Sequence, residues 1–127
     1  MRKEEDKFSK EIIGAAIEVH RYLGPGLVES AYEECLCREL AICGLANKKK
    51  KPLAVSYKGL KLDCGYRLDV VVGGLVILEL KAVDQIEPIH EAQLLTYLKL
   101  SDLKLGILIN FNVPLLKDGI KRIVNGL

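Results

Sequence analysis

Residues 65–81 read GYRLDVVVGGLVILELK, and this stretch predicts two strands that turn at the central Gly-Gly pair. The apolar residues of the stretch are β-branched or leucine, which is typical of strands covered on both faces. Three charged residues interrupt the apolar run, namely Asp69, Glu79 and Lys81. Burying a charge is costly unless the charge is paired, hydrogen-bonded or bound to a metal, so these residues need such a partner.

The register of the two strands decides whether the charges meet. A two-residue turn would pair Asp69 with Leu78, whereas a three-residue or bulged connection places Asp69 opposite Glu79. We predict the odd-length or bulged connection, which brings Arg67 and Asp69 of the first strand together with Glu79 and Lys81 of the second. A divalent cation, Mg²⁺ or Mn²⁺, would then turn the repulsion between the two carboxylates into binding. The alternative is a salt-bridged strand pair, with Asp69 bound to Lys81 or Arg67 bound to Glu79.

Length and composition indicate one domain over residues 1–127, because half of the residues are hydrophobic and can form a core without disulfides. No apolar run approaches the roughly 20 residues of a membrane helix, and the N-terminus lacks a signal-peptide pattern. We therefore expect a soluble, cytoplasmic protein. The four cysteines form no C-x-x-C pair and are expected to be reduced structural thiols: Cys35, Cys37, Cys43 and Cys64.

A net charge of +2 is too small to indicate a nucleic-acid binder by itself. The only basic run, Lys48 to Lys51, is interpreted as a solvated loop between a helix and a strand. The alternative for this run is a loop that contacts phosphate.

The pattern along the chain predicts an α/β fold in the order α-α-β-β-β-α-β. Strands that begin antiparallel and return through a helix form a mixed β-sheet flanked by helices. The expected helices span Phe8–Leu23, Val28–Cys43 and Pro88–Leu100; the expected strands span Leu53–Tyr57, Leu60–Asp63, the two halves of 65–81 and Leu103–Phe111, with a short edge strand within 120–124.

Three polar motifs follow one another in this framework. Residues 26–32 read G-x-x-E-x-x-Y, residues 69–81 read D-x₉-E-x-K, and residues 93–97 read Q-x-x-x-Y. In this order and spacing the chain resembles the GxxExxY protein family, a small-domain branch of the PD-(D/E)XK nuclease superfamily. The resemblance runs from about Ile12 to Val124, and the segments GYRLD and GILINF fit it as well. The proline that usually precedes the first acid is replaced by Leu68.

The resemblance implies a restriction-endonuclease-like fold and a Mg²⁺- or Mn²⁺-dependent nuclease that acts on DNA or RNA. It implies that Asp69 and Glu79 hold the metal, with the backbone carbonyl of Leu80 as a further ligand. It also implies that Glu29 completes the metal site, although an acid in the first turn of a helix is ordinarily favoured by the helix dipole. Lys81 would position or activate the attacking water.

The same resemblance gives Gln93 and Tyr97 the role of shaping the site and contacting substrate. Arg67 shares a strand face with Asp69, so it either holds a phosphate or pairs with an acid. Two alternatives stay open: a catalytically inactive module that binds nucleic acid or protein, and a metal-dependent phosphoesterase for a small nucleotide. A domain of this size could act as a homodimer across a duplex, but no stripe of residues in the sequence calls for a dimer interface.

Overall fold

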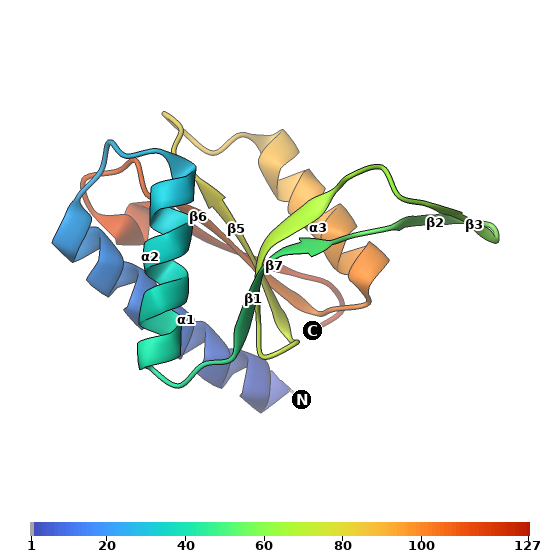
Figure 1. The fold of residues 1–127 in the computed structure, drawn as a ribbon, viewed down its shortest axis with the longest axis horizontal. Helices are drawn as coiled ribbons and strands as arrows, with labels where there is room; N and C mark the ends of the chain where they lie inside the picture. The colour runs from blue at the N-terminus through green and yellow to red at the C-terminus, as the bar shows by residue number, and fades with distance from the viewer. Residues whose placement is uncertain (1) are drawn as a thin grey trace.

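The computed structural model describes residues 2–127, and its order of helices and strands confirms the expected α/β fold (Figure 1). Two helices precede the central strands, and a third helix separates these strands from the last two. The elements are α1 (Arg2–Leu23), α2 (Glu29–Ile42), β1 (Asn47–Pro52), β2 (Val55–Tyr57), β3 (Leu60–Leu62), β4 (Arg67–Val72), β5 (Val76–Lys81), α3 (Pro88–Ser101), β6 (Leu105–Asn110), a 3-10 helix (Leu116–Gly119) and β7 (Ile120–Val124).

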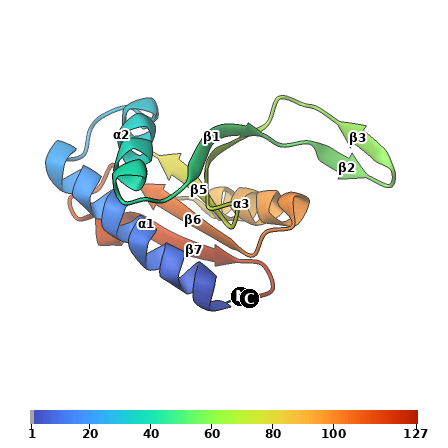
Figure 2. The ribbon, with the colours of Figure 1, turned by 60° about the horizontal axis from the view of Figure 1, so that its bottom comes forward.

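Five strands form one mixed sheet in the order β1-β4-β5-β6-β7. All neighbouring strands are antiparallel except β5 and β6, which run parallel because α3 carries the chain back across the sheet. The expected edge strand in the tail is confirmed as β7. Strands β2 and β3 pair only with each other and form a hairpin that projects from the body (Figures 1 and 2).

The connection between β4 and β5 has the predicted odd length. Val72 pairs with Val76, so the loop consists of three residues, and the Leu75 amide donates to the Val72 carbonyl at 3.0 Å. Gly73 and Gly74 adopt φ angles of 60° and 68°, which residues with a side chain rarely adopt. Continued by one residue beyond the last observed pair, Val70 with Leu78, this register would place Asp69 opposite Glu79.

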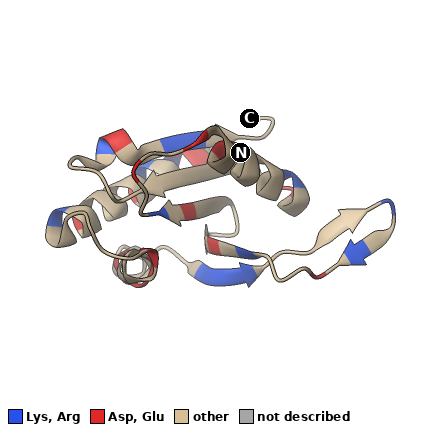
Figure 3. Ribbon diagram, turned by 90° about the horizontal axis from the view of Figure 1, so that it is seen from above, with Lys and Arg blue, Asp and Glu red and all other residues tan. Residues whose placement is uncertain are grey.

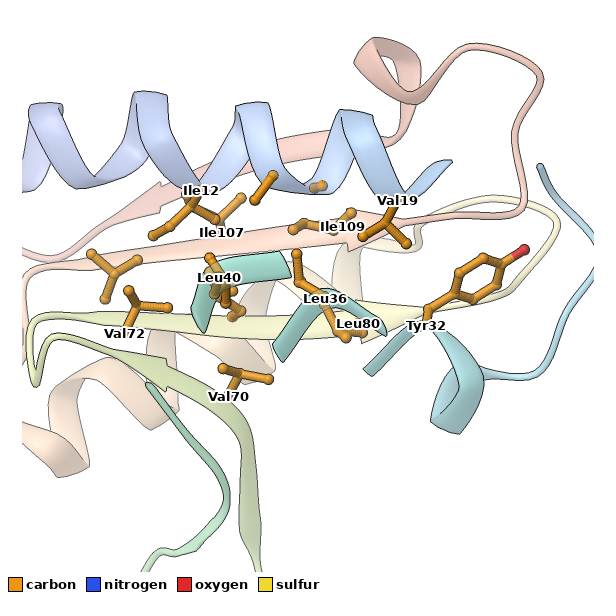
Figure 4. Packing of buried hydrophobic residues seen from close by; sticks show 14 of the residues in the cluster. Ile12, Val19, Tyr32, Leu36, Leu40, Val70, Val72, Leu80, Ile107 and Ile109 are labelled. Atoms are coloured by element: carbon orange, nitrogen blue, oxygen red, sulfur yellow. The ribbon is translucent and has the colours of Figure 1, made fainter. Parts of the chain in front are cut away.

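The sheet is covered on both faces, as its apolar strands predicted. Helices α1 and α2 pack on one face through a core that includes Ile12, Leu36, Val70, Val72 and Leu80 (Figure 4). Helix α3 packs on the other face through a smaller core, with Val71, Ile77, Leu94, Leu98 and Leu108 among its members. All six residues of β6 are buried between the two layers. None of the helices described within 2–127 is long and apolar enough to cross a membrane.

The four lysines at 48–51 correct one expectation, because they belong to strand β1 and not to a loop. The backbone of Asn47–Pro52 pairs with β4, while its lysine side chains remain exposed at the edge of the sheet. Lysines are common on edge strands because they discourage pairing with another chain. The expected strand Leu53–Tyr57 is also shorter than predicted: Leu53 is buried beside α3, and only Val55–Tyr57 forms a strand.

The close approach of α3 to β6 gives a test of the packing. A Cβ atom at Gly106 would lie 2.8 Å from Leu94 Cγ, whereas one at Gly14, on the exposed side of α1, would meet nothing within 4 Å. We expect Gly106→Ala to destabilise the protein by about 1–3 kcal/mol through overpacking. The matched change Gly14→Ala should stabilise it by about 0.5–1 kcal/mol, since glycine weakens a helix interior. Urea unfolding measures both; equal effects would contradict this packing.

Candidate active site

Strands β4 and β5 stop pairing through their backbones at Asp69 and Glu79. The regular ladder ends at Val70 and Leu78. Beyond it, the Asp69 amide donates to Glu79 Oε2 at 3.0 Å, and the Leu80 amide donates to Asp69 Oδ2 at 2.8 Å. Each carboxylate therefore accepts the hydrogen bond of a backbone amide on the opposite strand. The exchange holds both acids at the gap between the strands.

The side-chain alternation of β4 shifts at Asp69. Val70 packs in the core beneath α1 and α2, yet Leu68, two residues earlier, packs in the core beneath α3. In β1, Lys49 pairs with Val70 and Lys51 pairs with Leu68, while Lys50 between them has a left-handed φ of 54°. A lysine in this conformation costs about 1–2 kcal/mol. Such strain is found where function requires it, so Lys50 and Asp69 mark a candidate site.

A cavity of about 210 Å³ opens beside Asp69, between α2 and the strands. Two acids from α2 face it, four residues apart and thus on the same side of the helix. The cavity is lined by Glu29, Ser30, Glu33, Lys50, Asp69 and Leu80. Glu29 Oε2 also accepts a hydrogen bond from the Ala82 amide at 3.4 Å, which links the start of α2 to the end of β5. Three carboxylates and one ammonium group therefore share this small space.

Glu33 and Lys50 form an ion pair that the sequence analysis did not foresee. Lys50 Nζ lies 2.6 Å from Glu33 Oε2, and the side chain of Glu33 is only 8% exposed. Glu33 follows Glu29 by one helical turn, and this spacing is the signal that could have identified it. Nothing in the lysine run distinguishes Lys50 from its neighbours, because its role depends on the strand register.

Glu79 does not line the cavity, so the structure does not bring Asp69, Glu79 and Glu29 together at one point as the sequence analysis expected. Its neighbours Leu78 and Leu80 both pack on the α1–α2 side, so Glu79 faces α3, where its charge helps burial to raise the pKa of Tyr97. Among the residues of 2–127, no three His, Cys, Asp or Glu side chains lie close enough to hold a metal ion as they stand. The donors themselves are hard carboxylate oxygens, which suit Mg²⁺ or Mn²⁺.

Burial disfavours the charged form of both strand acids and raises their pKa values. It is the main cause that raises the pKa of Glu79 to about 8, with a second contribution from the charge of Asp69. Burial also raises the pKa of Asp69, against the hydrogen bond from the Leu80 amide. The charge of Lys81 lowers the pKa of both carboxyls, but it does not offset burial. A bound cation would favour the charged form of both carboxyls, so the chemistry of these donors suits a divalent metal.

The remaining expected site residues are Lys81, Arg67, Gln93 and Tyr97, and Lys81 and Tyr97 lie close enough for electrostatic interaction with the two strand acids. Lys81 is half-buried at the end of β5, and Arg67 is exposed and donates to the carbonyl of its neighbour Tyr66 at 3.1 Å. Within residues 2–127 neither side chain lies within 4 Å of a carboxylate oxygen, so the salt-bridge alternative is wrong for the structure as it stands. On α3, Tyr97 is buried and Gln93 is exposed one turn earlier.

A family model described as the PD-(D/E)XK nuclease superfamily matches residues 6–123, which is nearly the whole chain. The chain belongs to this superfamily. Searches of curated proteins and of solved structures found no match. The observed order of two helices, a mixed five-stranded sheet with an intervening helix, and a final strand is consistent with a restriction-endonuclease-like fold.

In this PD-(D/E)XK protein, the G-x-x-E-x-x-Y motif positions the start of α2. The Tyr32 hydroxyl donates to the Gly24 carbonyl at 2.7 Å and accepts from the Leu27 amide at 3.1 Å. The Tyr32 ring stacks on Phe111 with a centroid distance of 4.4 Å, and Figure 4 shows it at the end of the core. Tyr32 therefore holds the loop that positions Glu29 at the cavity.

Asn110 has a positioning role in the same PD-(D/E)XK fold that the sequence analysis missed. Its buried amide group donates to the Val83 carbonyl at 2.9 Å and accepts from the Val83 amide at 3.1 Å. The Phe111 amide donates to the Lys81 carbonyl at 2.9 Å. These bonds fix the chain just beyond Lys81. A single amide within the apolar run of residues 105–111 was the available signal.

The raised pKa of Glu79 predicts how stability depends on pH. A carboxyl whose folded pKa is raised from 4.5 to about 8 binds more protons in the folded state than in the unfolded state. The free energy of unfolding should therefore fall as the pH rises from about 4.5 to about 8. We expect Glu79→Gln to flatten most of this slope, since the amide does not titrate.

Urea unfolding at several pH values in EDTA measures the slope. The control Glu18→Gln, at an exposed position of α1, should retain the wild-type slope. A slope that Glu79→Gln leaves unchanged would contradict the buried, protonated Glu79.

Proposed function

We propose that this protein is a metal-dependent nuclease that hydrolyses phosphodiester bonds of DNA or RNA. The observation that carries the proposal is the pair of strand acids, Asp69 and Glu79, held at the gap between β4 and β5 with raised pKa values. Structural acids are normally exposed or paired with a base, and neither description applies to this pair. Buried carboxyls with raised pKa values, one of which lines a cavity, are typical of functional sites.

The metal ligands we propose are Asp69, Glu79, Glu29 and the carbonyl of Leu80. When bound, Mg²⁺ or Mn²⁺ supplies an activated water nucleophile and neutralises charge on the phosphate. The protein's part is to keep the carboxylates in place: the strands hold Asp69 and Glu79 through backbone amides, and the Tyr32 contacts hold the start of α2. Glu29 reaches the end of β5 at the Ala82 amide.

We assign the remaining roles to side chains that surround the gap. Lys81 would orient the attacking water and offset charge on the phosphate, since its charge already acts on both strand acids. Tyr97, next to Glu79, would shape the site, while the exposed side chains of Gln93 and Arg67 would contact substrate. Within the superfamily we place the chain in the GxxExxY family, acting in the cytoplasm.

A second candidate function is a catalytically inactive module that binds nucleic acid or protein. The observation that favours it is the present position of Glu79, which faces α3 and bonds the Asp69 amide instead of joining Glu29 at the cavity. Metal binding by the nuclease would require these acids to gather. An inactive module would keep the hydrogen bonds and bind no metal.

Substitution of Asp69 tests the proposed function. We expect Asp69→Asn to reduce Mg²⁺-dependent cleavage of a mixed panel of DNA and RNA by at least about 100-fold, because it removes a ligand and a negative charge from the metal site. The matched change Asp118→Asn, at an exposed residue outside the cavity, should leave cleavage unchanged. Equal activity in Asp69→Asn and the wild type would contradict the nuclease assignment.

Calorimetry with Mn²⁺ separates the nuclease from the inactive module. The wild type should bind Mn²⁺, and Asp69→Asn and Glu79→Gln should each bind it at least about 10-fold more weakly. An absence of binding heat in the wild type, together with no cleavage, would favour the inactive module.

A further inference from the structure

The charge of the chain is divided between two regions. Residues 47–67, which comprise β1, the β2–β3 hairpin and the first residue of β4, contain seven of the 19 Lys and Arg residues and only one of the 17 Asp and Glu residues. This segment therefore carries a formal charge of +6, whereas the rest of the chain carries −4. Figure 3 shows the basic residues along β1 and on the projecting hairpin. The small overall charge of +2 conceals this strongly basic region.

We call the segment from Val55 to Leu62 the arm. Its two strands pair only with each other, and every residue from 56 to 67 is exposed to solvent. The pairing places Val55 opposite Leu62 and Tyr57 opposite Leu60, so these four apolar side chains share one face. Tyr57 is 62% exposed and Leu60 is 55% exposed. An isolated two-stranded hairpin is marginally stable in water, so an apolar face on it indicates a binding surface.

At the tip of the arm, Lys58 occupies the first position of a turn that other residue types usually occupy. Lys58 and Gly59 form the two-residue turn, with φ angles of 46° and 86°. Asparagine, aspartate or glycine usually occupies the first position of such a turn, because the left-handed conformation is unfavourable for a long side chain. Lys58 Nζ lies 5.3 Å from the centre of the Tyr57 ring. The arm thus ends in an ammonium group beside an exposed aromatic ring.

The arm is directly connected to the candidate active site. It begins five residues after Lys50 of β1 and ends seven residues before Asp69 of β4, and both of these residues line the cavity. The Leu53 amide donates to the Tyr66 carbonyl at 3.0 Å, and the buried Leu53 anchors the base of the arm beside α3. A ligand bound along the arm would therefore lead to the cavity.

We propose that the arm and β1 bind single-stranded nucleic acid, with lysines on the phosphates and the apolar face against unpaired bases. A basic track combined with exposed aromatic side chains is the usual chemistry of single-strand binding. The bases of a duplex are stacked inside it, so the apolar face would have no counterpart there. A second copy of this chain is a poorer occupant, because a symmetric contact between two arms would bring like charges together.

Together with the proposed function, on which this step rests, binding along the arm implies that the substrate is a polynucleotide and not a mononucleotide. An extended strand rises about 3.3 Å per residue, so the segment from Pro52 to Lys58 at the tip of the arm reaches at most about 20 Å. A segment of this length can contact several nucleotides of one strand. The basic arm also explains how an anionic strand approaches a cavity lined by acids, since the arm attracts the phosphates that the acids repel.

Binding of a fluorescent 20-nucleotide oligothymidine in EDTA tests the proposal by fluorescence anisotropy at several salt concentrations. The wild type should bind it more tightly than a 20-base-pair duplex. Tyr57→Ala should weaken binding about 5- to 150-fold by removing a stacking surface. Lys58→Gln/Lys61→Gln should weaken binding and reduce the slope of log K against log salt by about 1.4, or about 0.7 for each lost phosphate contact.

The matched control is Lys7→Gln/Lys10→Gln, which removes the same charge from exposed positions of α1 and should leave binding and its salt slope unchanged. Thermal unfolding checks that all variants remain folded. Three results would overturn the proposal: duplex binding as tight as single-strand binding, arm variants that bind like the control, or a wild-type dimer in sedimentation that Tyr57→Ala dissociates.

These measurements do not depend on catalysis, because EDTA removes divalent metal. Arm binding without any Mg²⁺-dependent cleavage would retain the arm proposal and reject the nuclease. Cleavage of mononucleotides that requires Asp69, without arm binding, would reject the arm proposal and retain a metal-dependent phosphoesterase.

Discussion

The exchange of hydrogen bonds between Asp69 and Glu79 is the constraint on which the site depends. Two antiparallel strands would ordinarily continue their ladder, and a buried carboxylate on each would be strongly repulsive. Here each carboxylate takes a backbone amide of the opposite strand as its partner. The strands can separate without leaving those amides unsatisfied, and the acids remain at a fixed place in the sheet.

The rest of the fold supports the strands on both sides of this gap. Cores on both faces of the sheet hold β4, β5 and β6 in place, so the strands cannot move apart further without losing packing. Tyr32 fixes the loop before α2, and Asn110 fixes the chain after β5. Polar residues that are fully bonded in a core specify one arrangement, which is what a site of charged groups requires.

The charges of the molecule form two complementary regions. The cavity gathers carboxylates from α2 and β4, with Lys50 already engaged by Glu33. The adjoining β1 and arm are basic and exposed. When no cation is bound, the carboxylates of the cavity would repel a phosphate, whereas the lysines of β1 and the arm would attract it. Strands β1 and β4 belong to both regions, so a polyanion held on the arm is directed towards the acids.

Much of the fold followed from the sequence by itself, because helices, strands and turns depend mainly on residues that are close together along the chain. Helical periodicity, the Gly-Gly turn and apolar strand runs predicted the helices and the mixed sheet, and the charged residues of the two strands predicted the odd-length connection between β4 and β5. The charged residues within buried strands likewise indicated where a site would lie. The lysine run was wrongly predicted to be a loop. A run of lysines indicates exposure to solvent, and an edge strand exposes its side chains as a loop does.

Only the tertiary structure decided which charges meet. The left-handed turn at Lys50 shifts the alternation of side chains, brings Glu33 and Lys50 together and directs Asp69 to the cavity beneath α2. Glu79 instead faces α3, although an unbroken β4–β5 ladder would have placed it opposite Asp69. These contacts join residues from three or four elements, and their energies depend on burial and distance. Neither quantity can be read from the order of residues along the chain, because both arise only when the elements pack.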